Sequence, residues 1–270
     1  MHKPFKFRNR NRAVSADLLV LCYHAVSERW PADLSITPAN LAAQLDLLAA
    51  RGYRGVTFTE AVLHRPAHKA VAVTFDDAYR SVLELGEPIL TRLGWPATVF
   101  VPTDFAGTEQ PMSWPGIDQW ASGEFGRELV PMSWEGLGRL AEAGWEIGSH
   151  TCSHAHLTEL DESALDEELR RSKSECQDHL GSRCDAIAYP YGDHDLRVAN
   201  AARAAGYRAA GTLPSRMSAE DPLRWPRVGV YYGDDLRRFR TKVSPLVRRL
   251  RAYRAWEGAD RLRVSLRGRG

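Results

Sequence analysis

The chain has 270 residues, of which 44% are hydrophobic and 26% charged, and its formal net charge is +2. These values are typical of a globular protein, and they exclude intrinsic disorder, a collagen-like repeat and a coiled coil. A chain of this length buries enough apolar surface to fold without disulfides or a structural metal. We therefore expect any metal site in it to serve chemistry.

The expected elements alternate between strand and helix along most of the chain. Apolar runs predict strands at 18–22, 70–75, 97–101, 145–147, 186–189, 207–210 and 227–230. Segments of helical period, bounded by capping residues and glycines, predict helices at 38–51, 133–144, 161–180 and up to 205, with further helices before 94 and from 234. This order predicts an α/β protein with a parallel sheet covered by helices, either open or closed into a barrel. The segment 103–132 is expected to be an excursion beside the site.

The charge distribution and the two terminal segments indicate the domain bounds and the cellular compartment of the protein. We expect one domain over 17–243, between a basic arm at 1–16 and an arginine-rich tail at 244–270. The tail predicts either a solvated segment or a peripheral contact with an anionic membrane surface, and no motif predicts nucleic-acid binding. The apolar run at 18–22 is too short for a signal peptide, and no run is long enough to span a membrane, so we expect a cytoplasmic protein.

Four cysteines occur, and none forms a CxxC pair. This excludes a zinc ribbon. Cys22 lies in an apolar run and Cys152 lies among histidines, while the others are Cys176 and Cys184. We expect reduced and mostly buried thiols rather than disulfides.

Polar side chains follow the ends of several expected strands. Asp76 and Asp77 come after the second strand, His150 and His154 after the fourth, and His24 after the first. Because ligands bind at the carboxyl ends of parallel strands, these residues are expected to meet at one mouth of the fold. The sequence therefore predicts an active site there.

The residue types at this mouth indicate metal chemistry. Two adjacent carboxylates reach one site only where a strand passes into its loop, and there one can bind a cation while the other accepts a proton. Two histidines four residues apart, together with a carboxylate, are typical of a catalytic Zn²⁺ or Fe²⁺ site. Alternatively, Asp77 caps a helix and the histidines are ordinary loop residues. His156 is either a third ligand or a neighbour of the site.

The segment Tyr189-Pro190-Tyr191-Gly192 reads as a turn with aromatic walls. Its glycine permits close approach of the backbone, so a backbone N–H there is suited to stabilise an oxyanion. Its aromatic rings suit the apolar face of a sugar. A rigid loop that only packs is the alternative.

Taken together, the motifs TFDDAY, SHTCSH and AYPYG resemble the polysaccharide deacetylases, that is, the NodB-homology domain of carbohydrate esterase family 4. The resemblance covers about 18–243 and is nearest to a subgroup, the poly-N-acetylglucosamine deacetylases, that carries an N-terminal Tyr-His motif. It implies a single-domain, distorted (β/α)7-type barrel with parallel strands. It also implies a hydrolase that removes acetyl groups from sugars with one divalent metal ion, Zn²⁺ above all and otherwise Co²⁺, Ni²⁺ or Fe²⁺.

The resemblance also implies roles for individual residues. Asp76 matches the general base, and the metal ligands match Asp77, His150 and His154. Tyr191 matches the loop residue whose backbone N–H binds the oxyanion, with Tyr189 beside it on the substrate side.

Three positions depart from the usual family pattern. Ala78 stands where glycine is usual, and Ala188-Tyr189 stands where many members carry an arginine that orients the base. The late histidine that donates a proton in many members is missing. In the Tyr-His subgroup the N-terminal histidine takes this role, which makes His24 the candidate acid. Arg227 is a candidate for contact with the base or the substrate.

The leading hypothesis is a metal-dependent N-deacetylase that acts on an amino sugar in a glycan or glycoconjugate. An O-acetyl esterase or a small-amide amidohydrolase on the same scaffold would use the same machinery. A non-catalytic sugar-binding barrel is the third alternative. A two-carboxylate glycosidase is disfavoured, because adjacent aspartates do not flank a glycosidic bond.

Overall fold

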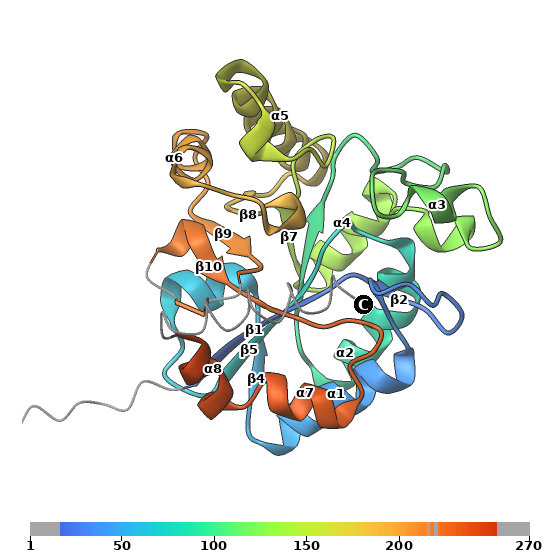
Figure 1. The fold of residues 1–270 in the computed structure, drawn as a ribbon, viewed down its shortest axis with the longest axis vertical. Coiled ribbons are helices and arrows are strands. Elements are labelled where there is room, and N and C mark those ends of the chain that lie inside the picture. The colour runs from blue at the N-terminus through green and yellow to red at the C-terminus, as the bar shows by residue number, and fades with distance from the viewer. Residues whose placement is uncertain (1–16, 215–216, 219–220, 253–270) are drawn as a thin grey trace, which may run out of the picture.

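The structure, a computed structural model, describes residues 17–214, 217–218 and 221–252 (Figure 1). The predicted arm at 1–16 and the tail from 253 onward lie outside the described residues. Within them, the expected order of strands and helices is confirmed.

A parallel sheet forms the centre of the molecule. Its strand order is β10-β9-β8-β7-β6-β5-β1-β11, with β4 also paired to β5, and every pairing is parallel. The strands are β1 Leu18–Tyr23, β4 Arg54–Val56, β5 Ala70–Phe75, β6 Thr98–Val101, β7 Glu146–Ser149, β8 Ala186–Ala188, β9 Ala209–Thr212, β10 Trp225–Pro226 and β11 Val228–Gly229. The sheet curls into a nearly closed barrel, which confirms the predicted fold class.

The barrel nearly closes at one residue. β10 and β11 lie at the two ends of the strand order, yet only Arg227 separates them in the chain. The Arg227 N–H donates to the carbonyl of Thr212 on the β9 side, and the Val230 N–H donates to that of Cys22 on the β1 side. Arg227 therefore sits at the seam where the two sheet edges approach each other.

Helices surround the barrel (Figure 1). The α-helices are α1 Pro38–Ala50, α2 Glu87–Leu93, α3 Asp118–Ala121, α4 Trp134–Glu142, α5 Glu162–Leu180, α6 Leu196–Ala204, α7 Leu236–Lys242 and α8 Pro245–Ala252. Side chains cap their first turns where the sequence predicts a start: Thr37, Ser133 and Asp161 accept from backbone N–H groups of α1, α4 and α5. Glycine in the left-handed conformation ends α2 at Gly94 and α5 at Gly181.

Several short elements were not predicted. They are the two-residue strands β2 Ala25–Val26 and β3 Ser35–Ile36, the π-helical segments η1 Glu60–His64 and η2 Val82–Gly86, and the 3₁₀ segments η3 Gly126–Leu129, η4 Leu157–Glu159, η5 Pro190–Gly192 and η6 Pro222–Arg224. Elements of two to five residues carry no readable hydrophobic period, and tertiary packing decides them. The expected excursion at 103–132 contains only α3 and η3.

Alternation along the strands sorts side chains between two cores. On β1, Leu19 and Leu21 pack with the outer core beneath the helices, whereas Val20 belongs to an inner cluster with Ala72 of β5 and Phe100 of β6. The inner residues are mostly small: alanines of β5, β8 and β9 line the interior. By the same alternation, Cys22, Thr74 and Asp76 point into the barrel.

The last described helix, α8, packs at the amino-terminal end of β1. Arg248 of α8 donates to the carbonyl of Leu18 at 2.9 Å and to both carboxylate oxygens of Asp17 at 2.7 and 2.6 Å. The Tyr53 hydroxyl also donates to Asp17. The first part of the predicted tail thus contacts the base of β1, while the predicted boundary at 243 stays a prediction.

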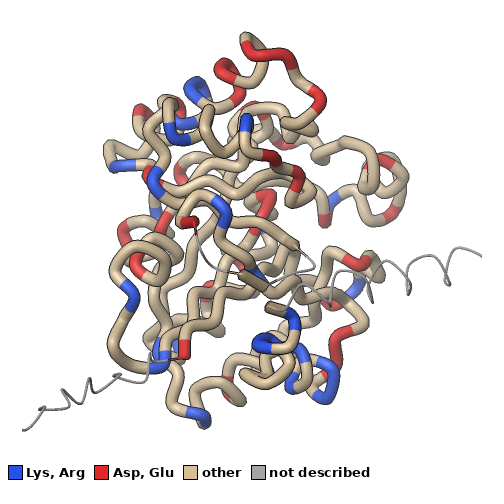
Figure 2. Tube along the Cα trace, turned by 60° about the vertical axis from the view of Figure 1, so that its left-hand side comes forward, with Lys and Arg blue, Asp and Glu red and all other residues tan. Residues whose placement is uncertain are grey.

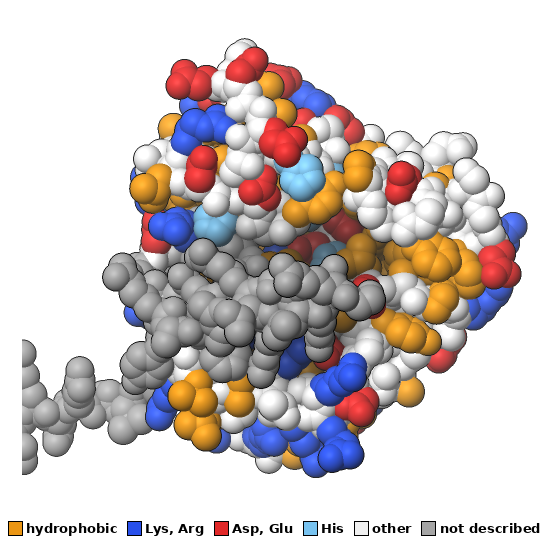
Figure 3. Space-filling view, in the orientation of Figure 1, with side chains coloured by type: hydrophobic (Ala, Val, Ile, Leu, Met, Phe, Trp, Pro, Cys, Tyr) orange, Lys and Arg blue, Asp and Glu red, His pale blue; other side chains and the backbone are white. Residues whose placement is uncertain are grey.

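Charges separate by region. α5 carries a run of acidic residues at one end of the molecule, whereas basic residues of α7 and α8 gather at the other (Figures 2 and 3). None of the helices in the described part of the chain is both long and apolar enough to cross a membrane.

Candidate active site

The predicted polar residues lie at the carboxyl ends of neighbouring strands. β5 ends directly before Asp76 and Asp77, β7 directly before His150, and β1 directly before His24. Figure 3 shows acidic and histidine side chains on the floor of a hollow bordered by hydrophobic side chains. Two groups of potential ligand atoms, Cys22–His24–Asp76 and Asp77–His150–His154, form at this mouth.

The Asp77 group brings three donor atoms to one point. The Nε2 atoms of His150 and His154 both lie 3.3 Å from Oδ1 of Asp77. All three side chains are buried, and Oδ1 of Asp77 makes no hydrogen bond within the described residues. The other ring nitrogen of His150, Nδ1, lies 2.8 Å from the carbonyl oxygen of Ala188.

This geometry fits a divalent cation. Because the Ala188 carbonyl can only accept, Nδ1 of His150 is the donor, and in the neutral ring Nε2 then carries a lone pair. That lone pair faces the carboxylate oxygen of Asp77, an arrangement that repels unless a positive centre lies between the atoms. Two imidazoles and one carboxylate with further positions open are the donor set of catalytic zinc.

Charges across this group keep the Asp77 carboxylate ionised. Burial alone would raise the pKa of Asp77, but the imidazoles of His150 and His154 beside it outweigh burial and hold the pKa well below its usual range. Burial lowers the pKa of His154. Asp77 is therefore ionised over the whole neutral range, as a ligand must be.

Asp76 has a different set of partners. Arg227 donates to Oδ1 at 2.6 Å and to Oδ2 at 2.8 Å, a bidentate pair in which both side chains are buried. The Cys22 thiol donates to Oδ2 at 3.3 Å. Burial would raise the pKa of Asp76, but the charges of Arg227 and His150 outweigh it and lower the pKa to about 2. Asp76 is thus a fixed carboxylate with a complete counter-charge.

Room for Arg227 comes from a glycine and an aromatic ring. A Cβ atom on Gly211 of β9 would lie 2.6 Å from Nε of Arg227, so only glycine leaves space for the guanidinium. The guanidinium carbon lies 5.4 Å from the ring centroid of Phe100, and Nη1 donates to the Thr74 hydroxyl at 3.0 Å. At the seam of the barrel, the guanidinium of Arg227 is therefore held in a fixed position beside Asp76.

His24 lies beside Asp76, with 9% of its surface exposed. Its Nδ1 atom is buried and has no hydrogen-bond partner among the described residues. Burial lowers the pKa of His24, while Asp77 and Asp76 partly oppose that shift. His24 is therefore a neutral, underpartnered imidazole at the edge of the site.

The backbone of the site is strained. Asp77, Ala78, Thr151, His154 and Tyr191 all have φ between +52° and +67°, a region that non-glycine residues rarely adopt. Such conformations cost on the order of 1–3 kcal/mol each and persist where surrounding contacts enforce them. Ala78 adopts this conformation although the resemblance placed glycine there.

Glu168 of α5 holds the histidine loop in place. Its Oε2 accepts from the backbone N–H groups of Cys152 and Ser153 at 2.8 and 3.0 Å, and its Oε1 accepts from the Ser153 hydroxyl at 2.5 Å. The loop that positions His150 and His154 is thereby tied to a nineteen-residue helix.

Aromatic rings form one wall of the site. Trp114, from the excursion at 103–132, stacks on His154 with ring centroids 4.0 Å apart. Tyr191 stacks on His156 at 3.9 Å and meets His154 edge-on at 4.6 Å, while 40% of its surface remains exposed. The excursion thus does border the site, and Tyr191 presents a ring beside it.

Tyr189 lies elsewhere. Its side chain is fully buried in the second core cluster, and its hydroxyl donates to the carbonyl of Leu223 at 3.0 Å. That position leaves no face for a substrate, so the substrate role predicted for Tyr189 has no support from its placement. The alternation of β8 explains this, because Tyr189 and Ile187 point toward the helices and Ala188 points inward.

The sequence does not predict one contact of Asp76, the hydrogen bond from the Cys22 thiol. It predicts only that Cys22 is a buried thiol, and all four cysteines are free and buried. The signal for this contact lies in the strand pairing. Cys22 of β1 is in register with Thr74 of β5, and Asp76, two residues after Thr74, points to the same side of the sheet. For Arg227 the predicted contact exists, because its guanidinium donates to both carboxylate oxygens of Asp76.

Comparison with known proteins agrees with this geometry. A family model described as polysaccharide deacetylase matches residues 64–210, more than half of the chain. The chain is 25% identical over 211 residues to the Bacillus subtilis protein YxkH, covering 76% of this chain and 68% of that one.

Solved structures share the fold. IcaB from Ammonifex degensii superposes with a TM-score of 0.62 at 26% identity, covering 88% of this chain and 98% of that chain. BC0361, a polysaccharide deacetylase from Bacillus cereus, has a TM-score of 0.68 at 24% identity and covers 84% of this chain and 69% of that chain. The chain therefore belongs to the polysaccharide deacetylase family and is a hydrolase that acts on acetylated polysaccharide.

Proposed function

We propose that this chain removes N-acetyl groups from an amino sugar in a glycan or glycoconjugate and releases acetate. The observation that carries the proposal is the pair of adjacent buried aspartates with opposite partners. Asp77 faces two imidazole nitrogens at 3.3 Å, while Asp76 is fixed by a bidentate arginine. One carboxylate is suited to hold a cation and the other to accept a proton.

Asp77, His150 and His154 are the residues that would hold one divalent cation, and zinc suits these donors best. When bound, such a cation polarises a carbonyl and lowers the pKa of water. The Trp114 ring on His154 and the Ala188 carbonyl at Nδ1 of His150 fix both imidazoles. These contacts orient the ligands in the way that outer partners do in metalloenzymes.

Asp76 acts as the general base. It accepts a proton from the water that attacks the acetyl carbonyl. Arg227 holds both carboxylate oxygens and so fixes their direction. Oδ2 also accepts from the Cys22 thiol, whereas Oδ1 keeps a lone pair for the incoming proton. The low pKa of Asp76 keeps it ionised and ready before each turnover.

His24 acts as the general acid toward the leaving amine, to which it passes the proton that Asp76 has taken from the attacking water. An amide nitrogen leaves only after protonation, whereas a sugar hydroxyl is a better leaving group. A buried imidazole next to the base is therefore a feature that an N-deacetylase needs more than an O-acetyl esterase does. The nearby carboxylates of Asp76 and Asp77 favour the charged form of His24 during the reaction.

Tyr191 contributes its backbone and its ring. Its N–H stabilises the oxyanion of the tetrahedral intermediate, and the left-handed conformation at φ +59° gives this turn its shape. The exposed ring, stacked on His156, offers an apolar face to a sugar ring.

The experiment is acetate release from N-acetylhexosamine oligosaccharides and from an O-acetylated xylan, with protein stripped of metal and then reloaded with Zn²⁺. We expect release from the N-acetylated substrates, only in the reloaded protein. Release from the xylan alone would make the chain an O-acetyl esterase. Absence of release from either substrate by protein loaded with one equivalent of Zn²⁺ would contradict the proposal.

A further inference from the structure

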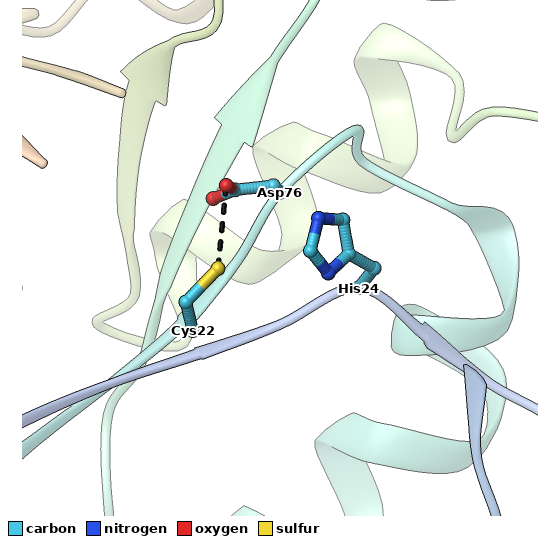
Figure 4. Close-up of side chains that lie close together, drawn as sticks. All are labelled: Cys22, His24 and Asp76. Atoms are coloured by element: carbon cyan, nitrogen blue, oxygen red, sulfur yellow. Dashed lines mark hydrogen bonds between the residues drawn. The ribbon is translucent and has the colours of Figure 1, made fainter. Parts of the chain in front are cut away.

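A second group of donor atoms lies on the other side of Asp76. Cys22 and His24 belong to the end of β1, and Asp76 follows β5, so three side chains from two paired strands meet (Figure 4). A sulfur, a ring nitrogen and a carboxylate oxygen lie within 4.8 Å of one another. The exposed fractions of the three residues are 0%, 9% and 2%.

One member of this group lacks the partner that a buried polar atom normally has. Nδ1 of His24 is buried and makes no hydrogen bond to any described residue. Figure 4 shows that the edge of the His24 ring that carries its two nitrogens is turned toward Cys22 and Asp76. Buried polar atoms are seldom left without a partner, so this edge has the capacity to bind something that the protein chain does not supply.

We propose that Cys22, His24 and Asp76 form a second cation site, selective for thiophilic cations of the Zn²⁺ and Cd²⁺ class. Thiolate, imidazole and carboxylate are the ligands that these cations prefer. On binding, the Cys22 thiol releases its proton to solvent and a sulfur–metal bond forms. The cation takes the place of the thiol hydrogen that now points to Oδ2 of Asp76 at 3.3 Å.

Arg227 sets the strength of this site. Its guanidinium already neutralises Asp76 through two hydrogen bonds, so a cation at Cys22 must share the carboxylate with a fixed positive charge. Within the described residues, Asp77 pairs with no arginine or lysine and faces two imidazoles. The second site therefore fills only after the first, in an excess of metal.

A cation in the second site prevents Asp76 from acting as the general base. A cation bound to Asp76 takes the lone pair that the proposed mechanism needs for a proton, and it engages His24 as well. Excess zinc then inhibits the enzyme. This consequence rests on the proposed function, whereas the binding itself does not.

The test uses Cd²⁺ as the probe, with equilibrium dialysis and ultraviolet spectroscopy of the thiolate-to-cadmium charge-transfer band. Wild-type protein is expected to bind two equivalents, and the charge-transfer band appears with the second. Cys22→Ser, which keeps the size of the side chain, is expected to raise the dissociation constant of the second equivalent at least about tenfold and to lose the band. Cys22→Ala gives the same result by removing the ligand.

Two control variants test whether the second equivalent and the band are specific to Cys22. Cys176→Ala removes a different fully buried thiol, and it is expected to keep both equivalents and the band. Asp77→Ala is expected to lose one equivalent and keep the band. Circular dichroism checks that each variant is folded before its binding is compared.

A wild type that binds a single equivalent without the band would overturn the inference, as would a band that survives in folded Cys22→Ser protein. The metal-binding test and the acetate-release test can fail independently of each other. Two equivalents with the band in a protein that releases no acetate would refute the proposed function alone. Zinc-dependent acetate release with one equivalent bound would refute the second site alone.

Discussion

Asp76 and Asp77 are neighbours in the chain, equally buried at 2% exposure, and they differ in what surrounds them. Asp76 meets a guanidinium that satisfies both of its oxygens without any bound ion. Asp77 meets two imidazole nitrogens, and its Oδ1 has no hydrogen bond in the described part of the chain. Burial alone therefore does not determine the role of a carboxylate, because the side chains around the carboxylate determine its role.

The difference has its origin in the barrel. Asp76 follows the side-chain alternation of β5, so it points into the barrel, toward the seam where Arg227 lies between β10 and β11. Asp77 has φ +67°, which turns it out of the strand toward the loop after β7. One change of backbone conformation thus sends adjacent carboxylates to two different sets of partners.

The largest effect is expected from Asp77→Ala. The two histidines lose the carboxylate that completes the cation site, so the first equivalent of zinc and the activity should both be lost. Loss of several kcal/mol of charge stabilisation corresponds to a fall in kcat/KM of about 10⁴-fold. Zinc content by elemental analysis and acetate release are the measurements, and an active variant without metal would refute the ligand assignment.

Asp76→Asn should separate chemistry from metal binding. The amide keeps the size of the side chain but cannot accept the proton, so kcat should fall about 10³-fold while zinc content stays near that of the wild type. Arg227 then loses its buried counter-charge, which should cost on the order of 3 kcal/mol of folding free energy. Zinc content and a urea unfolding curve measure both effects, and equal loss of metal in this variant would erase the distinction between the two aspartates.

A smaller effect is expected from His24→Gln. Glutamine retains a polar side chain but cannot supply a proton, so kcat on an N-acetylated substrate should fall about 10²-fold with zinc retained. On an O-acetylated substrate, whose leaving group needs less protonation, the loss should be smaller. Wild-type kcat on both substrates would mean that another group is the acid.

The smallest effect concerns the opposite end of the barrel. Burial would raise the pKa of Asp17, but the hydrogen bonds from Arg248 and Tyr53 outweigh it and lower the pKa. A carboxyl with a lowered pKa in the folded state stabilises the protein above its unfolded pKa of about 3.9, and this contribution fades as the pH falls through the folded value. Asp17→Asn should therefore cost about 1 kcal/mol at pH 7 and less in acid.

Urea unfolding of wild type and Asp17→Asn across this pH range measures the difference. A gap in unfolding free energy that does not shrink with acid would contradict the pairing of Asp17 with Arg248. Because this pair lies far from the aspartates in the fold, acetate release at pH 7 should be unchanged.

Much of this architecture is predictable from the sequence. The runs at 18–22 and 70–75 read as buried strands because they are continuous and apolar, and both exist as β1 and β5. The caps at Thr37, Ser133 and Asp161 place helix starts to within a residue, since their side chains accept from the first turn. The convergence of the strand ends follows from parallel pairing.

The rest depends on geometry that no local pattern carries. The pairing of Arg227 with Asp76 joins residues 151 positions apart across the closing seam, and it requires Gly211 to leave space. The burial of Tyr189 depends on which face β8 turns to the helices. The stacking of Trp114 on His154 depends on how the excursion folds over the mouth.

The most direct test of the contrast between the aspartates is thermal unfolding of metal-stripped protein, with and without one equivalent of Zn²⁺. A ligand that binds only the folded state raises the melting temperature. We predict a rise for the wild type and for Asp76→Asn, and a much smaller rise for Asp77→Ala, in which only the weaker group of Cys22, His24 and Asp76 can bind zinc. A full rise in Asp77→Ala, or one that is lost in Asp76→Asn, would contradict the assignment of the cation to Asp77.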